Sequence, residues 1–201
     1  MEILKTNGSV VDFDIIDQAL EVLCNDGVII YPTDTAYGLG ANIFSINALN
    51  KVFQLKNRER SKPISACFSS LSSLFYLVEI GNKSQRIVEK NLPGPFTFIM
   101  YKKRNLGFKF FDITSHKIGV RIPNNRISME LSKIFPITAT SANISGEKTL
   151  SNVKEIAKQL NGDVDLAIDV GPIIADKFST VIDLTRPNPK VLREGLGSLR
   201  F

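Results

Sequence analysis

The chain has 201 residues, of which 43% are hydrophobic and 22% are charged, a composition that is ordinary for a soluble globular protein with an apolar core. No apolar run approaches the length of a membrane span, and the N-terminus lacks the basic-then-apolar pattern of a signal peptide, so we expect a cytoplasmic protein with no membrane partner. The net charge of +5 favours anionic partners such as nucleotides, pyrophosphate or RNA.

Helices and strands alternate along the first half of the chain. The predicted elements, in order, are a short edge strand at 2–5, a helix at 14–26, a buried strand at 28–31, a helix with its apolar stripe on Ile46, Leu49, Val52 and Phe53, a strand at 64–68, and helices at 71–78 and 87–92. Asp12 or Asp14 is suited to cap the first helix and Gly27 to close it, and Ser45 caps the second.

The second half begins with a strong break at 92–95. The predicted elements are a strand at 96–101, an irregular basic segment at 103–115, a strand at 117–123, a helix that Asn124 or Asn125 caps and that carries Ile127, Leu131, Ile134 and Phe135, a helix that Ser151 or Asn152 begins and Gly162 closes, and strands at 166–170, 180–184 and 190–193. Strands follow one another directly near the C-terminus. We therefore predict one α/β domain with a twisted sheet of mixed parallel and antiparallel strands, flanked by helices.

The cysteines and the single histidine limit the possible chemistry. Cys24 and Cys67 have a spacing that fits neither a metal site nor a disulfide framework, and His116 alone excludes multi-histidine metal sites. Cys24 lies on the apolar face of its predicted helix, so we interpret it as a core thiol.

The usual nucleotide-binding signatures are missing. The loop at 32–40 contains three hydroxyl groups and two glycines, and Gly38 and Gly40 start like a dinucleotide fingerprint, but Ile43 occupies the place of the third glycine. No phosphate-binding loop of the Walker type and no nucleophile elbow occur. The residues that remain for chemistry are cations and hydroxyls, which suit the positioning of phosphates and polar substrates.

The stretch 136–146 gathers short polar side chains at the end of a predicted strand. Pro136 stops the preceding helix, Ile137 and Thr138 suit a buried strand, and hydroxyl and amide groups follow up to Gly146. Open α/β sheets hold ligands at such strand ends, where small side chains let a ligand approach the backbone. An ordinary Ser- and Asn-rich turn explains the same residues, so the stretch alone leaves both interpretations open.

Basic residues gather in two segments, Lys51, Lys56, Arg58, Arg60 and Lys62 in the first and Lys102, Lys103, Arg104 and Lys109 in the second. The second is interpreted as a solvated face. In the first, Arg58 is suited to grip phosphate oxygens, whereas Lys56 equally suits the capping of a helix C-terminus. Arg121 stands between apolar neighbours and needs an anionic partner, either a ligand carboxylate or a structural Asp or Glu, and Arg193 poses the same choice.

Seven motifs occur in an order that resembles a known family. They are Tyr31–Gly40, Lys56–Arg58, Leu92–Pro95, Val120–Pro123, Thr140–Gly146, Ser179–Asp183 and Leu192–Arg193. Each motif alone is weak, but together they resemble the YrdC/YciO-like family over nearly the whole chain. The chain ends soon after Arg193, as in the short single-domain members, so we expect one YrdC-like domain over residues 1–201.

The resemblance implies a nucleotidyltransferase activity, threonylcarbamoyl-AMP synthase, which forms threonylcarbamoyl-adenylate and pyrophosphate from L-threonine, bicarbonate and ATP. ATP is then a substrate, and Mg²⁺ is expected to accompany it, held mainly by the ATP phosphates and water. The product would serve the N6-threonylcarbamoyl modification of adenosine (t6A) in tRNA. The implied partners are these small molecules, a product-receiving t6A-forming protein complex, and tRNA or double-stranded RNA.

The resemblance also implies roles for individual residues. The threonine-binding set is Thr35, Cys67, Arg121, Ser141 and Ser179. The ATP-binding set is Arg58, Lys62, Lys117, Asn143, Ser151 and Arg193. Lys56 and Arg58 form the catalytic set, in which Lys56 adds positive potential. Three positions depart from the family pattern, because Cys67 stands where many members carry a histidine, Lys117 where others place a threonine, and Glu194 where a proline is frequent.

Two other functions fit the same residues. The first is a basic concave face that binds double-stranded RNA or tRNA without turnover, although no stretch interleaves aromatic and basic residues as single-strand binders do. The second is carbamoyl-adenylate chemistry with another acceptor, because a similar domain occurs in hydrogenase-maturation carbamoyltransferases. The intact Lys56-x-Arg58 and Ser141-x-Asn143 pairs favour the synthase.

Overall fold

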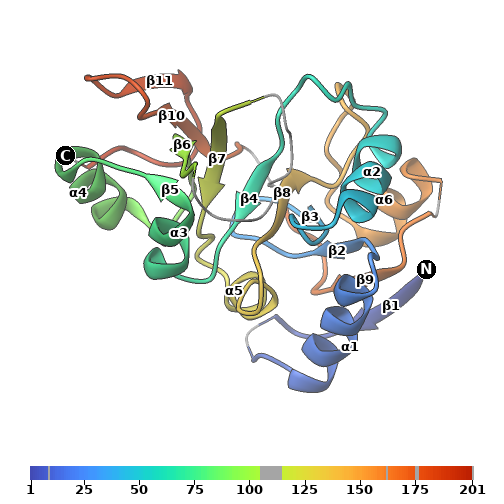
Figure 1. Cartoon of the computed structure of the whole chain (residues 1–201). Helices are drawn as coiled ribbons and strands as arrows, with labels where there is room; N and C mark the ends of the chain where they lie inside the picture. The colour runs from blue at the N-terminus through green and yellow to red at the C-terminus, as the bar shows by residue number, and fades with distance from the viewer. Residues whose placement is uncertain (9, 105–114, 162, 175–176, 201) are drawn as a thin grey trace.

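The computed structural model describes residues 1–8, 10–104, 115–161, 163–174 and 177–200, in which one twisted sheet is flanked by helices (Figure 1). Its strands are β1 (Glu2–Lys5), β2 (Ile29–Tyr31), β3 (Gly38–Gly40), β4 (Ser65–Cys67), β5 (Val78–Glu79), β6 (Phe96–Lys102), β7 (Lys117–Arg121), β8 (Ile137–Ser141), β9 (Leu166–Asp169), β10 (Thr180–Asp183) and β11 (Lys190–Arg193). The helices are α1 (Phe13–Cys24), α2 (Ile46–Leu55), α3 (Leu71–Leu77), α4 (Asn82–Asn91), α5 (Arg126–Leu131) and α6 (Val153–Gln159).

The sheet mixes parallel and antiparallel pairs, as the sequence predicts. Its order is β1-β9-β2-β3-β8-β4-β7-β6-β10-β11, and β5 pairs with β6 beside this path. Strand β8 joins the two halves, since its first three residues pair with β4 and its last two with β3, both antiparallel. The polar stretch 136–146 includes β8, and the residues that follow Ser141 leave the sheet there.

Side-chain capping defines the starts of five helices: Ser70 Oγ accepts from the Ser73 N–H at the start of α3, and the other four caps are those expected from the sequence. The side chains of Asp12, Ser45, Asn125 and Asn152 accept hydrogen bonds from backbone N–H groups in the first turns of α1, α2, α5 and α6. The sequence left two candidates for each of three N-caps, and the structure shows that Asp12, Asn125 and Asn152 are the caps. At the C-terminus of α1, Asp26 adopts the left-handed conformation with φ of 60°, and the Gly27 N–H donates to the Val22 carbonyl.

The assignment of Cys24 to the core is wrong. The buried stripe of α1 consists of Ile15, Ile16, Ala19 and Leu23, and Cys24 is the last helical residue, one position beyond that stripe. Its thiol is exposed. Ile134 was likewise expected on an apolar helical stripe. It is 65% exposed because α5 ends at Leu131 and does not continue that stripe.

Two short strands were not predicted from the sequence, β3 and β5. Strand β3 contains two glycines, which have low strand propensity. The structure explains them, because a Cβ at Gly38 or Gly40 would lie 2.9 Å from ring atoms of Tyr31 on the neighbouring strand β2. Strand β5 has only two residues and continues directly from α3.

Alternation along the strands separates two faces of the sheet. On β6, Phe96, Phe98 and Met100 enter the larger apolar core, whereas Thr97 and Ile99 face the other side. On β7, Ile118 and Val120 are likewise in the core. A second, smaller core covers the opposite face only beside α1 and α5. Beyond that second core, the face lined by β4, β7, β6 and β10 encloses a cavity.

Two predictions lie outside the described residues, namely Gly162 as the end of α6 and Lys109 with most of the irregular basic segment. Across the ranges that the structure does describe, no helix has the length and apolarity needed to cross a membrane.

Candidate functional site

The cavity on the open face of the sheet has a volume of about 380 Å³, within the usual range for a small-molecule site. It brings together residues from the β2–β3 loop, the segment before β4, and strands β6, β7, β8, β10 and β11. Seven of the predicted site residues line it, namely Thr35, Arg58, Lys117, Arg121, Ser141, Ser179 and Arg193. Five do not line it, namely Lys56, Lys62, Cys67, Asn143 and Ser151.

The cavity is a cationic environment. Its lining contains three arginines and one lysine, and no aspartate or glutamate contributes to it among the residues that the structure describes. Most of the other lining groups are hydroxyls and small residues, such as Ser65, Gly119 and Ala139. Such a surface is suited to bind an anion by charge and by hydrogen-bond donation.

Arg58 and Arg193 are held by carbonyl oxygens rather than by carboxylates. Arg58 donates from Nε to the Lys62 carbonyl at 3.1 Å and from Nη2 to the Pro63 carbonyl at 2.8 Å. Arg193 donates from Nε and Nη2 to the Ser179 carbonyl at 3.2 and 3.0 Å. Burial lowers the pKa of both guanidinium groups, and the charge of Arg121 adds to this for Arg193. Neither arginine forms an ion pair with a described residue, so both keep an uncompensated charge at the cavity.

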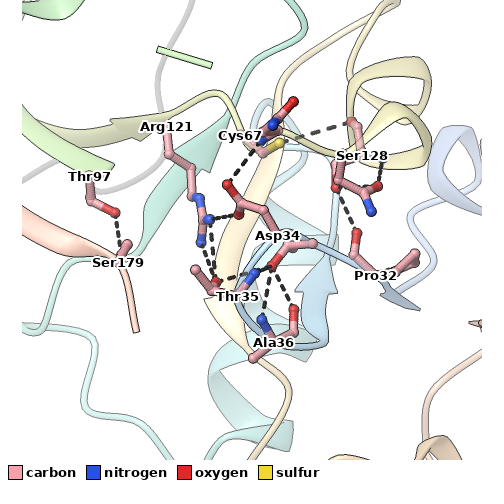
Figure 2. Close-up of polar contacts among 12 residues, drawn as sticks. Pro32, Asp34, Thr35, Ala36, Cys67, Thr97, Arg121, Ser128 and Ser179 are labelled. Carbon is pink, nitrogen blue, oxygen red and sulfur yellow. Dashed lines mark hydrogen bonds and ion pairs between the residues drawn. The ribbon is translucent and has the colours of Figure 1, made fainter. Parts of the chain in front are cut away.

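The anionic partner of Arg121 is a structural acid, which is one of the two alternatives that the sequence left open. Figure 2 shows the Arg121 guanidinium above Asp34 and Thr35 of the β2–β3 loop, with Nη2 donating to Asp34 Oδ1 and both Nη1 and Nη2 lying 3.4 Å from Thr35 Oγ1. The side chains of Arg121 and Asp34 are 10% and 11% exposed. Arg121 Nε is buried and has no hydrogen-bond partner among the described groups. Among the described groups, the hydrogen-bonding capacity of this arginine is therefore not fully used.

The hydroxyls of the cavity are fixed by their neighbours. Thr33 Oγ1 accepts from the N–H groups of Thr35 and Ala36 and donates to the Ala36 carbonyl, which rigidifies the loop that carries Thr35. On the opposite wall, Ser179 Oγ lies 2.9 Å from Thr97 Oγ1 (Figure 2) and accepts from Arg193 Nη2 at 3.2 Å. Thr35 and Ser179 thus stand on the two sides of Arg121.

Lys56 anchors the loop after β8 rather than facing the cavity. Its side chain is buried, and Nζ donates to the Ser141 carbonyl at 2.5 Å, the Asn143 carbonyl at 2.7 Å and Asn143 Oδ1 at 3.2 Å. Burial, followed by the charge of Arg58, lowers the Lys56 pKa to about 7, while the three oxygen acceptors favour the ammonium form. The structure therefore places the Lys56 ammonium within the protein, beside the cavity lining, and its expected contribution of positive potential stays a prediction.

Asn143 belongs to the same anchored loop. Its Oδ1 accepts from Ser141 Oγ and Lys56 Nζ, and its Nδ2 donates to the Glu147 carbonyl at 2.7 Å. The side chain is buried and fully engaged within the loop. Asn143 Oδ1 thus orients Ser141, which does line the cavity, and the expected role of Asn143 in ATP binding stays a prediction.

Three other predicted residues lie away from the cavity for separate reasons. Cys67 is fully buried in the smaller core, 3.3 Å from Ser132 Oγ of the α5 C-cap, and burial raises its pKa to about 11. The Lys62 side chain is exposed and pairs with Glu59 at 3.5 Å. Ser151 lies before α6, where its carbonyl accepts from Ile173 N–H.

Lys117 lines the cavity but directs its ammonium to the rim. Its Nζ donates to Thr185 Oγ1 at 2.7 Å, lies 3.9 Å from Asp183 Oδ2 and sits 5.6 Å from the centroid of the Tyr101 ring. Because Asp183 compensates part of its charge, Lys117 contributes less to the field in the cavity than Arg58 and Arg193 do.

Sequence reasoning missed Asp34, Thr97 and Phe178 as site residues. Asp34 is adjacent to Thr35 in the motif already singled out, and the need of Arg121 for an acid was the signal that pointed to it. Thr97 is a hydroxyl residue between apolar neighbours in a predicted strand, which indicates the face opposite to the core. Phe178, whose ring lies 5.6 Å from the Arg193 guanidinium, carried no such signal.

The described residues do not form a metal site. No group of three or more histidine, cysteine, aspartate or glutamate side chains converges within the described ranges, and the cavity lining lacks the carboxylates that Mg²⁺ prefers.

Comparisons with known proteins agree with this architecture. The family model Sua5/YciO/YrdC, described as telomere recombination, matches residues 21–195. A relative from Methanocaldococcus jannaschii is 38% identical over 175 residues, which cover 87% of this chain and 82% of that protein. The threonylcarbamoyl-AMP synthase of Pyrococcus abyssi is 32% identical over 171 residues, covering 84% of this chain and 50% of the relative.

Solved structures show the same similarity. The crystal structure of P. abyssi Sua5 complexed with L-threonine superposes with a TM-score of 0.89 at 29% identity and covers 97% of this chain, which in turn spans 58% of that longer chain. The crystal structure of Escherichia coli YciO superposes with a TM-score of 0.88 at 31% identity and covers 98% of both chains.

The position of Lys56 predicts a pH dependence of stability. Its folded pKa of about 7 lies below its ordinary value of 10.5, so the unfolded chain binds a proton that the folded chain releases between these values. Stability from this group therefore rises with pH above 7, by up to about 1.4 kcal/mol per pH unit. We expect Lys56→Met to lose this rise in urea unfolding at pH 7, 8 and 9, whereas the exposed control Lys62→Met keeps it. A wild-type-to-variant difference that is constant across pH would contradict the lowered pKa.

Proposed function

The chain belongs to the Sua5/YciO/YrdC family, and from this membership we propose that it is an L-threonylcarbamoyladenylate synthase. The observation that carries the proposal is the cavity without carboxylates, where the uncompensated Arg58 and Arg193 lie on the same surface as the compensated Arg121. Phosphate groups require uncompensated cations, and an amino acid carboxylate requires directional donors. The cavity offers both.

The proposed reaction begins with carbamate formation. The amine of L-threonine forms a C–N bond with the carbon of CO₂ and loses a proton, or with the carbon of bicarbonate, in which case that proton leaves with the bicarbonate hydroxyl as water. A carbamate oxygen then attacks the α-phosphorus of ATP, and the bond to the β-phosphate oxygen breaks to release pyrophosphate. Such phosphoryl chemistry depends on alignment and charge stabilisation more than on a strong base. This agrees with a described lining that contains neither a carboxylate nor a histidine.

We assign the two ends of the cavity by charge. Arg121, Thr35 and Ser179 bind L-threonine, with the carboxylate at the guanidinium of Arg121, whose buried Nε has no partner among the described groups. Arg58 and Arg193 bind the phosphates, since a guanidinium that carbonyl oxygens hold in place keeps its full charge for the ligand. Lys56 and Asn143 act indirectly, because they hold the loop that presents Ser141.

The name and ligand of the P. abyssi relative support this assignment, since that protein is named threonylcarbamoyl-AMP synthase and was crystallised with L-threonine. Following the family, the product would be transferred to adenosine in tRNA by a t6A-forming protein complex. The E. coli YciO relative is uncharacterised, so the similarity to it does not distinguish a synthase from a member with another acceptor or an RNA-binding role.

The reaction itself gives the first test. We expect pyrophosphate release from ATP to require both L-threonine and bicarbonate, and mass spectrometry to detect the adenylate only when both are supplied. An RNA-binding module would show no turnover and a steep loss of RNA affinity with salt. Release that is independent of threonine would instead point to another carbamoyl acceptor.

Arg58 is expected to contribute through its charge at the phosphates. Arg58→Ala should lower kcat/KM for ATP about tenfold or more, because a charged hydrogen bond contributes about 1.5–3 kcal/mol. The matched control is Arg60→Ala, which removes an exposed arginine of the same segment that does not line the cavity. Equal effects of the two substitutions would show that only general positive charge matters.

Arg121 is expected to act on the amino acid. Arg121→Ala should raise the KM for L-threonine more than the KM for ATP, because the guanidinium is assigned to the threonine carboxylate. Steady-state kinetics with each substrate varied in turn measures both constants, and thermal unfolding shows whether the fold survives. A larger effect on ATP than on threonine would reverse the assignment of the two ends of the cavity.

A further inference from the structure

Asp34 lies directly behind the proposed amino acid subsite without lining the cavity. Its Oδ1 accepts from Arg121 Nη2 (Figure 2), and its Oδ2 accepts from the Asn124 backbone N–H at 3.0 Å. Both carboxylate oxygens are therefore engaged, and the side chain is 11% exposed. Asp34 has no lining position from which to contact a ligand itself, so its effect on a ligand passes through Arg121.

The loop that carries Asp34 is held from both sides. Thr33 closes the turn with its hydroxyl, and Ser128 Oγ of α5 donates to the Pro32 carbonyl at 2.6 Å. Because the backbone is fixed at Pro32, Thr33 and Asn124, the carboxylate of Asp34 has a defined place. This carboxylate pairs with Nη2 of the Arg121 guanidinium. Nε of the same guanidinium has no partner among the described groups.

The ion pair also sets the local charge. Arg121 is the only one of the three cavity arginines with a carboxylate partner among the described residues. In a site that is about nine-tenths buried, the charge of Arg121 is balanced by Asp34, so a ligand carboxylate is recognised there by hydrogen-bond direction rather than by net charge. A second negative charge on the ligand meets no net attraction from this pair and loses its hydration on entry.

We propose that Asp34 is a positioning residue that determines charge selectivity: by balancing Arg121, it restricts the subsite to amino acids with one carboxylate and an uncharged side chain. This inference rests on the proposed function, because it takes the ligand of Arg121 to be an amino acid. It extends that function by naming the group that rejects acidic amino acids, which differ from threonine chiefly in side-chain charge.

The test compares the binding of L-threonine and L-aspartate to the full chain, each measured by isothermal titration in wild type and in Asp34→Asn. The substitution keeps the size of the side chain and removes its charge, so Arg121 becomes uncompensated. We expect the ratio of aspartate affinity to threonine affinity to rise at least tenfold. We also expect the KM for threonine to change while the KM for ATP stays within twofold.

The matched control is Asp165→Asn. Asp165 also holds a backbone N–H, since its Oδ2 accepts from Val28 N at 2.7 Å, but it pairs with no arginine in the described structure, so its removal should leave the ratio unchanged. If Asp34→Asn does not fold, Asp34→Ser carries the same test with a shorter acceptor.

The outcomes separate the two claims. If both affinities fall together in Asp34→Asn and their ratio stays constant, Asp34 only supports the loop and the charge-selectivity proposal is wrong. If the wild-type chain does not bind threonine at all, the proposed function fails first, and the selectivity that rests on it fails with it.

Discussion

The divided pairing of β8 is the constraint on which the site depends. Because β8 pairs with β4 through Ile137–Ala139 and with β3 through Thr140 and Ser141, it holds together the two halves of the sheet. The β2–β3 loop, the segment after α2 and the end of β8, which leads into the next loop, consequently meet at one cavity. The buried ammonium of Lys56 ties the second of these segments to the third by three hydrogen bonds. The buried Lys56 thus stabilises the segments that form the cavity, whereas the cations that line the cavity are available to a ligand.

The distribution of carboxylates gives the cavity its chemical character. The lining has four basic side chains, but Asp34 compensates Arg121 and Asp183 partly compensates Lys117. Arg58 and Arg193 are oriented by neutral carbonyl groups, which fix their direction without reducing their charge. Because Arg58 and Arg193 keep an uncompensated charge and Arg121 does not, the first two suit a strongly anionic ligand group and Arg121 suits a singly charged one. This difference provides a physical reason for placing phosphates at one pair of arginines and an amino acid at the third.

Much of the fold could be predicted because apolar periodicity is strong in this chain. All six helices in the described part were anticipated, and the alternatives for the caps were resolved by local hydrogen bonds. The two missed strands have glycines or only two residues, so they carry little propensity signal, and their existence depends on neighbours such as Tyr31 that are distant in sequence. Cys24 was misplaced because one step of 100° around a helix moves a side chain from the buried stripe to solvent.

The candidate site was predictable in composition but not in side-chain direction. Arg58, Arg121 and Arg193 do line one cavity, and the need of Arg121 for an anionic partner, either a ligand carboxylate or a structural acid, followed from its apolar neighbours. Lys56 and Asn143 bind each other instead, since a motif places a residue on a segment without specifying whether it faces a ligand or the protein. Cys67 shares its strand face with Ser65, yet Ser65 lines the cavity and Cys67 packs below α5, because the boundary between cavity and core falls between them.

We propose that a single cavity holds a nucleotide and an amino acid side by side, with the compensated Arg121 at the amino acid and the uncompensated Arg58 and Arg193 at the phosphates. A crystal structure of this chain with L-threonine and a non-hydrolysable ATP analogue tests that claim most directly. The account predicts the threonine carboxylate at the Arg121 guanidinium and the phosphates between Arg58 and Arg193. Phosphates on Arg121, or either ligand bound outside this cavity, would contradict it.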